Sequence, residues 1–133
     1  MHQFEFLLRD FINTEKVMQP GGCVLLHDCC PTTHEMAVRD FHPGDWTGDV
    51  WKTLLILLRN RPDLDIQVAN AAPTGLVVIR GLNPKSRVLR THYDELVAEY
   101  EAMTLDGLEG GLGGLYRNFE LLSDDAVLDT FET

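Results

Sequence analysis

The sequence predicts an α/β fold in which a buried strand lies between two helices and a pair of antiparallel strands completes the sheet. An amphipathic helical pattern over residues 2–18 leads through a Pro-Gly-Gly turn into an unbroken apolar run. Two later strand-like runs, 64–69 and 75–80, are joined by a connection too short for a parallel crossover, so we expect them to pair as antiparallel neighbours. The predicted order is therefore helix, strand, helix, strand, strand.

Composition places the chain among ordinary globular domains and excludes two classes of partner. The 133 residues are 44% hydrophobic and 24% charged, which is typical of one folded domain. A net charge of -10 without a basic stripe argues against nucleic-acid binding. No apolar run could span a bilayer and the N-terminus lacks a signal-peptide layout, so we expect a cytoplasmic protein with no membrane partner. Its three cysteines are expected to be free thiols.

The first predicted helix carries a broad apolar stripe. Its members recur at helical spacing: Phe4, Leu7, Leu8, Phe11 and Ile12. The charged residues are predicted to lie mostly on the opposite, solvent-facing side: Glu5, Arg9, Asp10, Glu15 and Lys16. Gln19-Pro20-Gly21-Gly22 ends the helix by the usual proline and glycine signals.

Residues 22–28 predict a strand buried on both faces, because its apolar residues do not alternate with polar ones. His27 and Asp28 come at its carboxyl end, which is where open α/β sheets bind their ligands. We therefore regard both as candidate functional residues. The residues alone fit equally well a simple turn, with Cys29 and Cys30 as small apolar filler.

A loop-rich segment, 29–47, follows the strand and contains a short predicted helix at 33–39. Such a connection is a natural place for substrate contacts, and His34 and Trp46 are the candidates, although a plain surface loop is at least as good an interpretation. A soft-metal cluster of His27, Asp28, Cys29, Cys30 and His34 is disfavoured, because ligands at adjacent positions rarely converge on one ion.

The second predicted helix runs from Thr47, as N-cap, to Asn60. Its apolar side chains are predicted to point inward, with Trp51 in the core and Trp46 left open, and Lys52 and Arg59 to point outward. Residues 84–133 are predicted to form a helical, glycine-rich and acidic extension to a domain at 1–83. The extension is expected to hold a helix over 91–103 with Thr91 as N-cap, a flexible link at 107–115 and a frayed end at 120–133.

Several short motifs occur in order along about three fifths of the chain. They are His2, Arg9-Asp10-Phe11, Pro20-Gly21-Gly22, Leu26-His27-Asp28, the run 46–52 and Pro73-Thr74-Gly75-Leu76. With these motifs, the run from His2 to Leu82 resembles the carboxyl-terminal half of a class I S-adenosylmethionine-dependent methyltransferase, and within that superfamily it is most similar to the macrocin-type sugar O-methyltransferases.

The resemblance implies a partial Rossmann-like methyltransferase sheet containing strands five to seven, the last one antiparallel. The four earlier strands, with the glycine-rich turn and the acidic residue that bind S-adenosylmethionine, are then missing, so we expect a fragment. Asp28 matches a position that helps to hold Mg²⁺ in related enzymes, although Cys29 stands where relatives have a second oxygen ligand. His27 or His2 is the expected general base on a small-molecule acceptor hydroxyl.

Two functions follow from these expectations. The first is O-methyl transfer from S-adenosylmethionine to a small-molecule hydroxyl, with the cofactor-binding half supplied from outside this chain. The second is a non-catalytic remnant or interaction module, whose exposed sheet edge forms a homo-oligomer or binds a missing N-terminal half.

Overall fold

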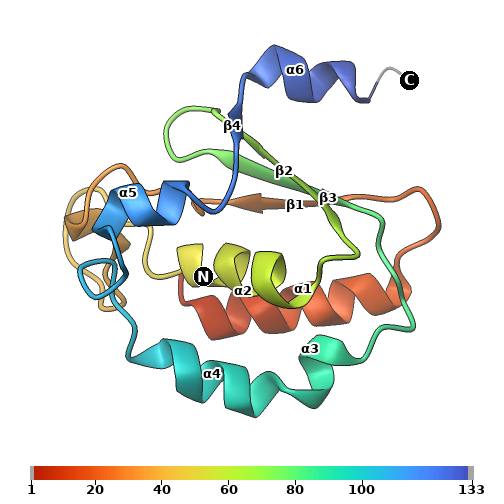
Figure 1. The fold of residues 1–133 in the computed structure, drawn as a ribbon, viewed down its shortest axis with the longest axis horizontal. Helices are drawn as coiled ribbons and strands as arrows, with labels where there is room; N and C mark the ends of the chain where they lie inside the picture. The colour runs from red at the N-terminus through yellow and green to blue at the C-terminus, as the bar shows by residue number, and fades with distance from the viewer. Residues whose placement is uncertain (1, 132–133) are drawn as a thin grey trace.

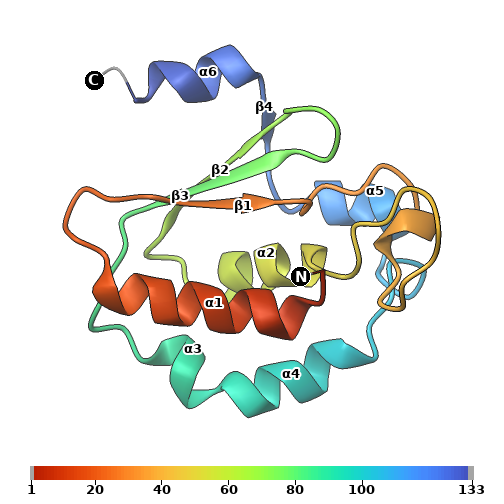
Figure 2. The same ribbon diagram turned by 180° about the vertical axis from the view of Figure 1, so that it is seen from behind.

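The computed structural model describes residues 2–131, which form a four-stranded sheet with helices on both faces (Figures 1 and 2). Helices α1 (Phe4–Val17) and α2 (Trp51–Asn60) pack side by side against one face. Helices α3 (Val88–Thr91) and α4 (Tyr93–Glu101) lie beyond them, and α6 (Asp124–Asp129) lies on the other face. A short helix, η1 (Glu35–Ala37), sits in the loop after the first strand. The mixed α/β architecture that the sequence predicts is confirmed.

The sheet has the strand order β1-β3-β2-β4. β3 (Leu76–Arg80) lies between β1 (Val24–His27) and β2 (Asp65–Ala69) and is antiparallel to both. The predicted antiparallel pairing of the last two strands is thus confirmed, with the register Asp65 opposite Arg80 and Ala69 opposite Leu76. β4 (Leu121–Leu122) adds a short parallel strand beside β2.

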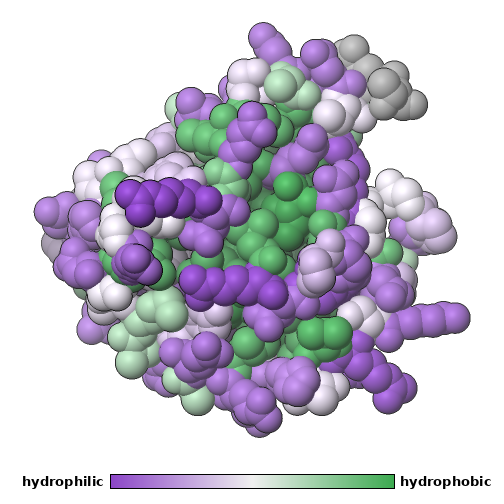
Figure 3. Space-filling view, in the orientation of Figure 1, coloured by the Kyte–Doolittle hydropathy of each residue, from purple (hydrophilic) through white to green (hydrophobic). Residues whose placement is uncertain are grey.

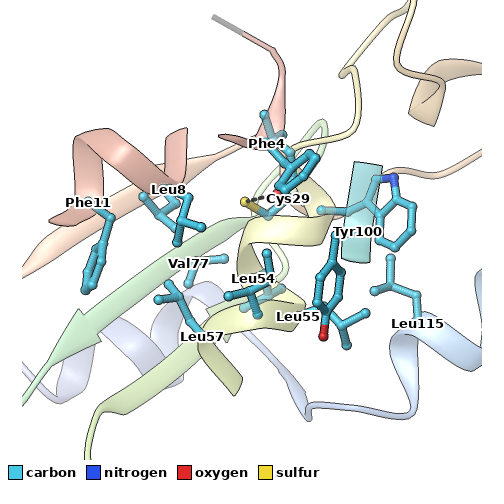
Figure 4. Close-up of a cluster of buried hydrophobic side chains, with 14 of the residues drawn as sticks. Phe4, Leu8, Phe11, Cys29, Leu54, Leu55, Leu57, Val77, Tyr100 and Leu115 are labelled. Atoms are coloured by element: carbon cyan, nitrogen blue, oxygen red, sulfur yellow. Dashed lines mark hydrogen bonds between the residues drawn. The ribbon is translucent and has the colours of Figure 1, made fainter. Parts of the chain in front are cut away.

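The main core fills the layer between the sheet and α1 and α2. Figure 4 shows Phe4, Leu8 and Phe11 of α1 meeting leucines of α2 and Val77 of β3, all of them almost fully buried. The stripe at i, i+4 and i+7 predicted for α1 is therefore the face that packs on the sheet.

Glu15 corrects the predicted polar face of α1. It continues the buried stripe one turn after Phe11 and is only 4% exposed. Burial of a carboxylate is tolerated here because Arg61 donates to both of its oxygens, at 2.7 and 2.8 Å, and the amide of Asn83 donates to one of them at 3.0 Å. The pattern of residue types alone did not show this pairing across 46 positions.

The prediction that β1 is buried on both faces is wrong. Leu26 is buried against the helices, whereas the side chain of Leu25 points to the other face and is 54% exposed. The helix that covers this second face, α6, packs mainly on Ala69 and Val78, so it leaves Leu25 uncovered. Figure 3 shows apolar side chains reaching the surface between α6 and the helical layer.

The start of α2 also differs from the prediction. The helix begins at Trp51, and the hydroxyl of Thr47 donates to the carbonyl of Met36 at 3.1 Å instead of capping it. Trp51 lies in the core as predicted. Lys52, predicted to point outward, is 1% exposed because its ammonium group lies between Asp49 and the carbonyl of Glu101.

The carboxyl-terminal extension has more regular structure than its composition suggests. The glycine-rich link contains a helix, α5 (Gly111–Tyr116), and the stretch expected to fray forms β4 and α6 up to Asp129. Thr91, predicted to cap the helix, is the last residue of α3. The last two residues of the predicted frayed end lie outside the described part of the chain. Within residues 2–131, no helix combines the length and apolar character needed to span a membrane.

Candidate functional site

Asp28, directly after β1, is the centre of the candidate site. Its backbone has φ 66°, the left-handed conformation that non-glycine residues adopt rarely and at a cost of about 1 kcal/mol or more. Asp and Asn tolerate this conformation better than other residues do. The turn aims the Asp28 carboxyl group away from the core into a cleft, where its side chain is 19% exposed.

Three side chains from separate parts of the chain converge on the Asp28 carboxylate. The Thr74 hydroxyl donates to Oδ1 at 2.5 Å, and His27 Nδ1 lies 3.2 Å from the same oxygen. His2 Nε2 lies 3.1 Å from Oδ2. Of the residues expected at the site, His2, His27 and Asp28 are thus brought together. Thr74 is a member that sequence reasoning did not single out, although its Pro-Thr-Gly setting marked a turn at the start of a strand.

The backbone around His2 is held in place by the loop before α2. The His2 carbonyl accepts from the amide of Asp49 at 3.1 Å, and Asp49 Oδ1 accepts from the amide of Phe4 at 2.9 Å. Gly48 has φ +66°, and a Cβ there would lie 1.8 Å from the His2 carbonyl oxygen. Glycine is therefore required at position 48 for His2 to reach Asp28.

The turn between β2 and β3 fixes Thr74 in the same way. Thr74 is 5% exposed, and its carbonyl accepts from the amide of Cys30 at 3.0 Å. At Gly75, with φ +78°, a Cβ would lie 2.6 Å from the Cys30 sulfur. The close approach of the two loops thus depends on glycine at position 75, and it brings the Thr74 hydroxyl against Asp28.

A cleft of about 210 Å³ opens beside this cluster. Its walls include Asp28, Thr74, Asp45 and Trp46. The Trp46 ring lies 5.0 Å from the His2 ring, and its indole nitrogen donates to the carbonyl of Val38 at 2.8 Å. Trp46 is therefore a wall of the cleft, which answers the question that the sequence left open.

His34, the other expected substrate contact, is not brought to this cluster. Its Nε2 accepts from the amide of Leu112 at 3.3 Å and lies 3.5 Å from Asp106 Oδ1. It lines a different cleft, together with Arg39 and Lys52.

A buried ionic cluster behind the site connects α1, α2 and the intervening loop. Asp49 Oδ2 accepts from both Arg39 and Lys52 at 3.0 Å, and Arg39 forms a second, bidentate pair with Glu5. Burial opposes ionisation of Glu5, but the hydrogen bonds and charge of Arg39 outweigh it and lower the pKa of Glu5. The cluster positions Asp49, and through Asp49 it positions His2.

The adjacent thiols do not face the cleft. Burial raises the pKa of Cys30 to about 11 and raises the pKa of Cys29 further, with the neighbouring Cys30 and Asp28 adding to the second effect. The Cys29 sulfur lies 3.7 Å from the carbonyls of His27 and Val50. Both thiols therefore stay protonated and unreactive at neutral pH.

The donor set does not fit a magnesium site. Mg²⁺ requires an octahedral shell of oxygens, whereas the Asp28 oxygens are engaged by Thr74 and two imidazoles and the next residue presents a buried thiol. Among residues 2–131 no group of three or more His, Cys, Asp or Glu could hold a metal ion. The described residues also place no glycine-rich turn between a strand and a following helix, which is the element that the family resemblance assigns to S-adenosylmethionine binding.

Comparison of the chain with protein-family models, with curated protein sequences and with solved structures finds no match. The chemistry of the site therefore has to be argued from its geometry. A carboxylate that binds one nitrogen of an imidazole fixes the ring and stabilises its protonated form. The second nitrogen of the same ring is then available to accept a proton from a bound molecule.

Proposed function

We propose that this chain is the acceptor-binding part of an S-adenosylmethionine-dependent O-methyltransferase that acts on a small-molecule hydroxyl. The observation that carries the proposal is the His2–Asp28 pair at the end of β1, with a separation of 3.1 Å and an adjoining cleft. The antiparallel strand β3 and the motifs in the first three fifths of the chain are consistent with the same family. The methyl donor would be held by polypeptide that is not part of this chain.

In the proposed reaction His2 is the general base. With its Nε2–H donated to Asp28 Oδ2, the ring accepts the proton of the acceptor hydroxyl at Nδ1, and the Asp28 carboxylate stabilises the imidazolium that forms. Thr74 keeps Asp28 oriented through its hydrogen bond. Trp46 provides an aromatic wall against which a ring-shaped acceptor packs. His27, whose side chain is 63% exposed and lies 3.2 Å from Asp28, is the alternative base.

The test compares two polypeptides: the 133-residue chain and a longer product that adds whatever sequence is encoded in frame directly upstream of it. Each is titrated calorimetrically with S-adenosylmethionine, with and without Mg²⁺, and then assayed for transfer of a tritiated methyl group to sugars and phenols. We expect binding and transfer by the longer product alone. Micromolar binding by the shorter chain, or a longer product that binds no cofactor, would contradict the proposal.

Variants of the longer product test the role of the site. Asp28→Asn is expected to reduce methyl transfer about 100-fold, because the carboxylate that stabilises the imidazolium of the base His2 is lost, while cofactor affinity stays unchanged. Asp65→Asn is the matched control. Asp65 is exposed and begins β2, at the end of that strand opposite to the end near the Asp28 cluster, so its change should leave transfer unaffected. Equal rates for the two variants would remove Asp28 from the reaction.

A second function is favoured by one specific observation, namely the exposure of Leu25 on an edge strand. Among the described residues β1 pairs with β3 only, so its other edge presents free backbone groups. This is the geometry of a module that self-associates through its sheet edge. Sedimentation velocity tests it: a dimer that Leu25→Lys converts to monomer supports the module, and a monomeric wild-type chain at about 100 μM argues against it.

A further inference from the structure

A groove on the helical side of the molecule carries a local excess of positive charge. It lies between α1 and the α3–α4 segment, has a volume of about 280 Å³ and is lined by eight residues: Arg9, Ile12, Asn13, Lys16, Arg90, Thr91, Tyr93 and Asp94. Three are cations and one is a carboxylate. Since the whole chain has a net charge of -10, this local balance is the reverse of the protein as a whole.

The groove follows from the helical repeat of α1. Its four contributions from that helix, residues 9, 12, 13 and 16, are spaced i, i+3, i+4 and i+7 and therefore share one face. The opposite wall comes from the end of α3 and the start of α4. In Figure 2 these elements lie next to each other below the sheet. The groove lining contains cations from both of them, Arg9 and Lys16 from α1 and Arg90 from α3.

One of the cations is held in position by an aromatic ring. The Arg9 guanidinium lies 4.6 Å from the centre of the Tyr93 ring, and the Tyr93 hydroxyl donates to the carbonyl of Glu5 at 2.8 Å. A stacked guanidinium keeps its N–H donors free for another partner while its rotation is restricted. Such pre-organisation lowers the entropic cost of binding an anion.

The three cations also lack carboxylate partners within residues 2–131. They differ in this from Arg39, Lys52 and Arg61, the cations of the ionic clusters described above, each of which pairs with an acid. No ion pair within 4 Å is formed by Arg9, Lys16 or Arg90 in the described chain, although 21 acidic residues are present in the sequence. The groove therefore presents unneutralised donors.

We propose that this groove binds a small phosphorylated molecule. A phosphate group offers several oxygens to donors that converge from different directions, and arginine matches its geometry in a bidentate manner. Asn13 and Thr91 add neutral side-chain donors. The groove lies along α1 beyond the end that holds His2, so this site is separate from the Asp28 cluster and does not depend on the proposed methyltransferase function.

Calorimetric titration of the full chain with inorganic pyrophosphate at low salt tests the proposal. We expect saturable binding of one ligand per chain, weakened at least about tenfold by Arg90→Gln and several-fold by Lys16→Gln. Arg117→Gln removes an exposed arginine from a different part of the surface and is the matched control, with an expected change of less than about twofold. Asp94→Asn removes the only carboxylate of the groove lining and should tighten binding.

The results distinguish a specific binding site in the groove from non-specific attraction of the anion to positive charge on the surface. Absence of binding, or an equal loss of affinity in Arg90→Gln and Arg117→Gln, overturns the proposal. An unchanged affinity in Asp94→Asn also contradicts it, because removal of a negative charge from the lining must favour an anion bound there. These residues make no side-chain hydrogen bonds in the described structure, and circular dichroism of each variant verifies that it folds like the parent chain.

Discussion

Two carboxylates show how the same functional group serves structure in one place and is available for chemistry in another. Glu15 is buried, and both of its oxygens accept from Arg61, which also pairs with Asp63. Asp28 has no cationic partner of fixed charge, since its neighbours are a hydroxyl and two histidines. It also stands on strained backbone and borders a cleft. Full burial and a partner of fixed charge mark the first cluster as architecture, whereas partial exposure, partners without fixed charge and an adjoining cleft mark the second as a candidate site.

The largest effect is expected from breaking the architectural cluster. Arg61→Met leaves the Glu15 carboxylate buried without its partner, so the free energy of unfolding should fall by about 3–5 kcal/mol. Urea denaturation measures it, with Arg59→Met, a change at a more exposed arginine, as the control. The double variant Glu15→Gln/Arg61→Met should recover part of the loss. If Arg61→Met costs no more than the control, the distinction between the two clusters fails.

An intermediate effect is expected at the site. Thr74→Val removes a buried hydroxyl donor from Asp28 and should cost about 1–2 kcal/mol by urea denaturation. Asp28→Asn should cost less than about 1 kcal/mol, because asparagine tolerates the left-handed backbone at position 28 and still accepts from Thr74. A loss at Asp28 as large as that at Arg61 would show that the site is itself architectural.

A smaller loss of stability is expected when acid weakens the ion pairs of Arg61 with Asp63 and of Arg39 with Glu5. The hydrogen bonds of Arg61 lower the pKa of Asp63, and those of Arg39 outweigh burial and lower the pKa of Glu5. A carboxyl group whose pKa is lower in the folded than in the unfolded state stabilises the fold at pH values above the unfolded-state pKa. This stabilisation is lost as the pH falls through the folded-state pKa. Unfolding by urea between about pH 5 and pH 3 should therefore become easier, and Glu5→Gln should flatten this dependence. An unchanged slope in that variant would argue against the Glu5–Arg39 pair.

The smallest effect is expected in the chemical labelling of the cysteine thiols, which does not change the stability of the chain. Cys30 packs against Gly75 behind the Asp28 cluster, and burial raises its pKa to about 11. With Ellman's reagent at pH 8 we expect Cys23, which is half-buried, to react first, and Cys29 and Cys30 to react only after unfolding. Rapid reaction of all three thiols in the native chain would show that the loops around Asp28 open readily.

Local sequence patterns predicted the helices and strands of this fold well, but they did not predict pairings between residues far apart in the sequence. The stripe of Phe4, Leu8 and Phe11 and the short connection between β2 and β3 follow from spacing, so both were predicted correctly. The burial of Glu15 and Lys52 depends on partners 46 and 49 positions away, and residue type alone assigns such side chains to the surface.

The same reasoning explains the result at the site. His27 and Asp28 are candidate residues because they follow a strand, which is a local signal. His2 entered as a general base through the family resemblance, and Thr74 was missed, because their meeting depends on the close approach of Gly48 and Gly75 to other loops. In a sequence, these glycines read only as turns.

The two edges of the sheet differ in what they offer to other polypeptides. At one edge β4 covers the end of β2 with a strand of just two residues, Leu121 and Leu122, which is a poor template for further pairing. At the other edge β1 is an apolar strand whose outer side pairs with no strand among residues 2–131. A strand added from another polypeptide would therefore find more backbone to pair with at β1 than at β4. A pairing of β1 with β1 of a second copy would be isologous, so it would close at two copies and would not propagate into a fibre.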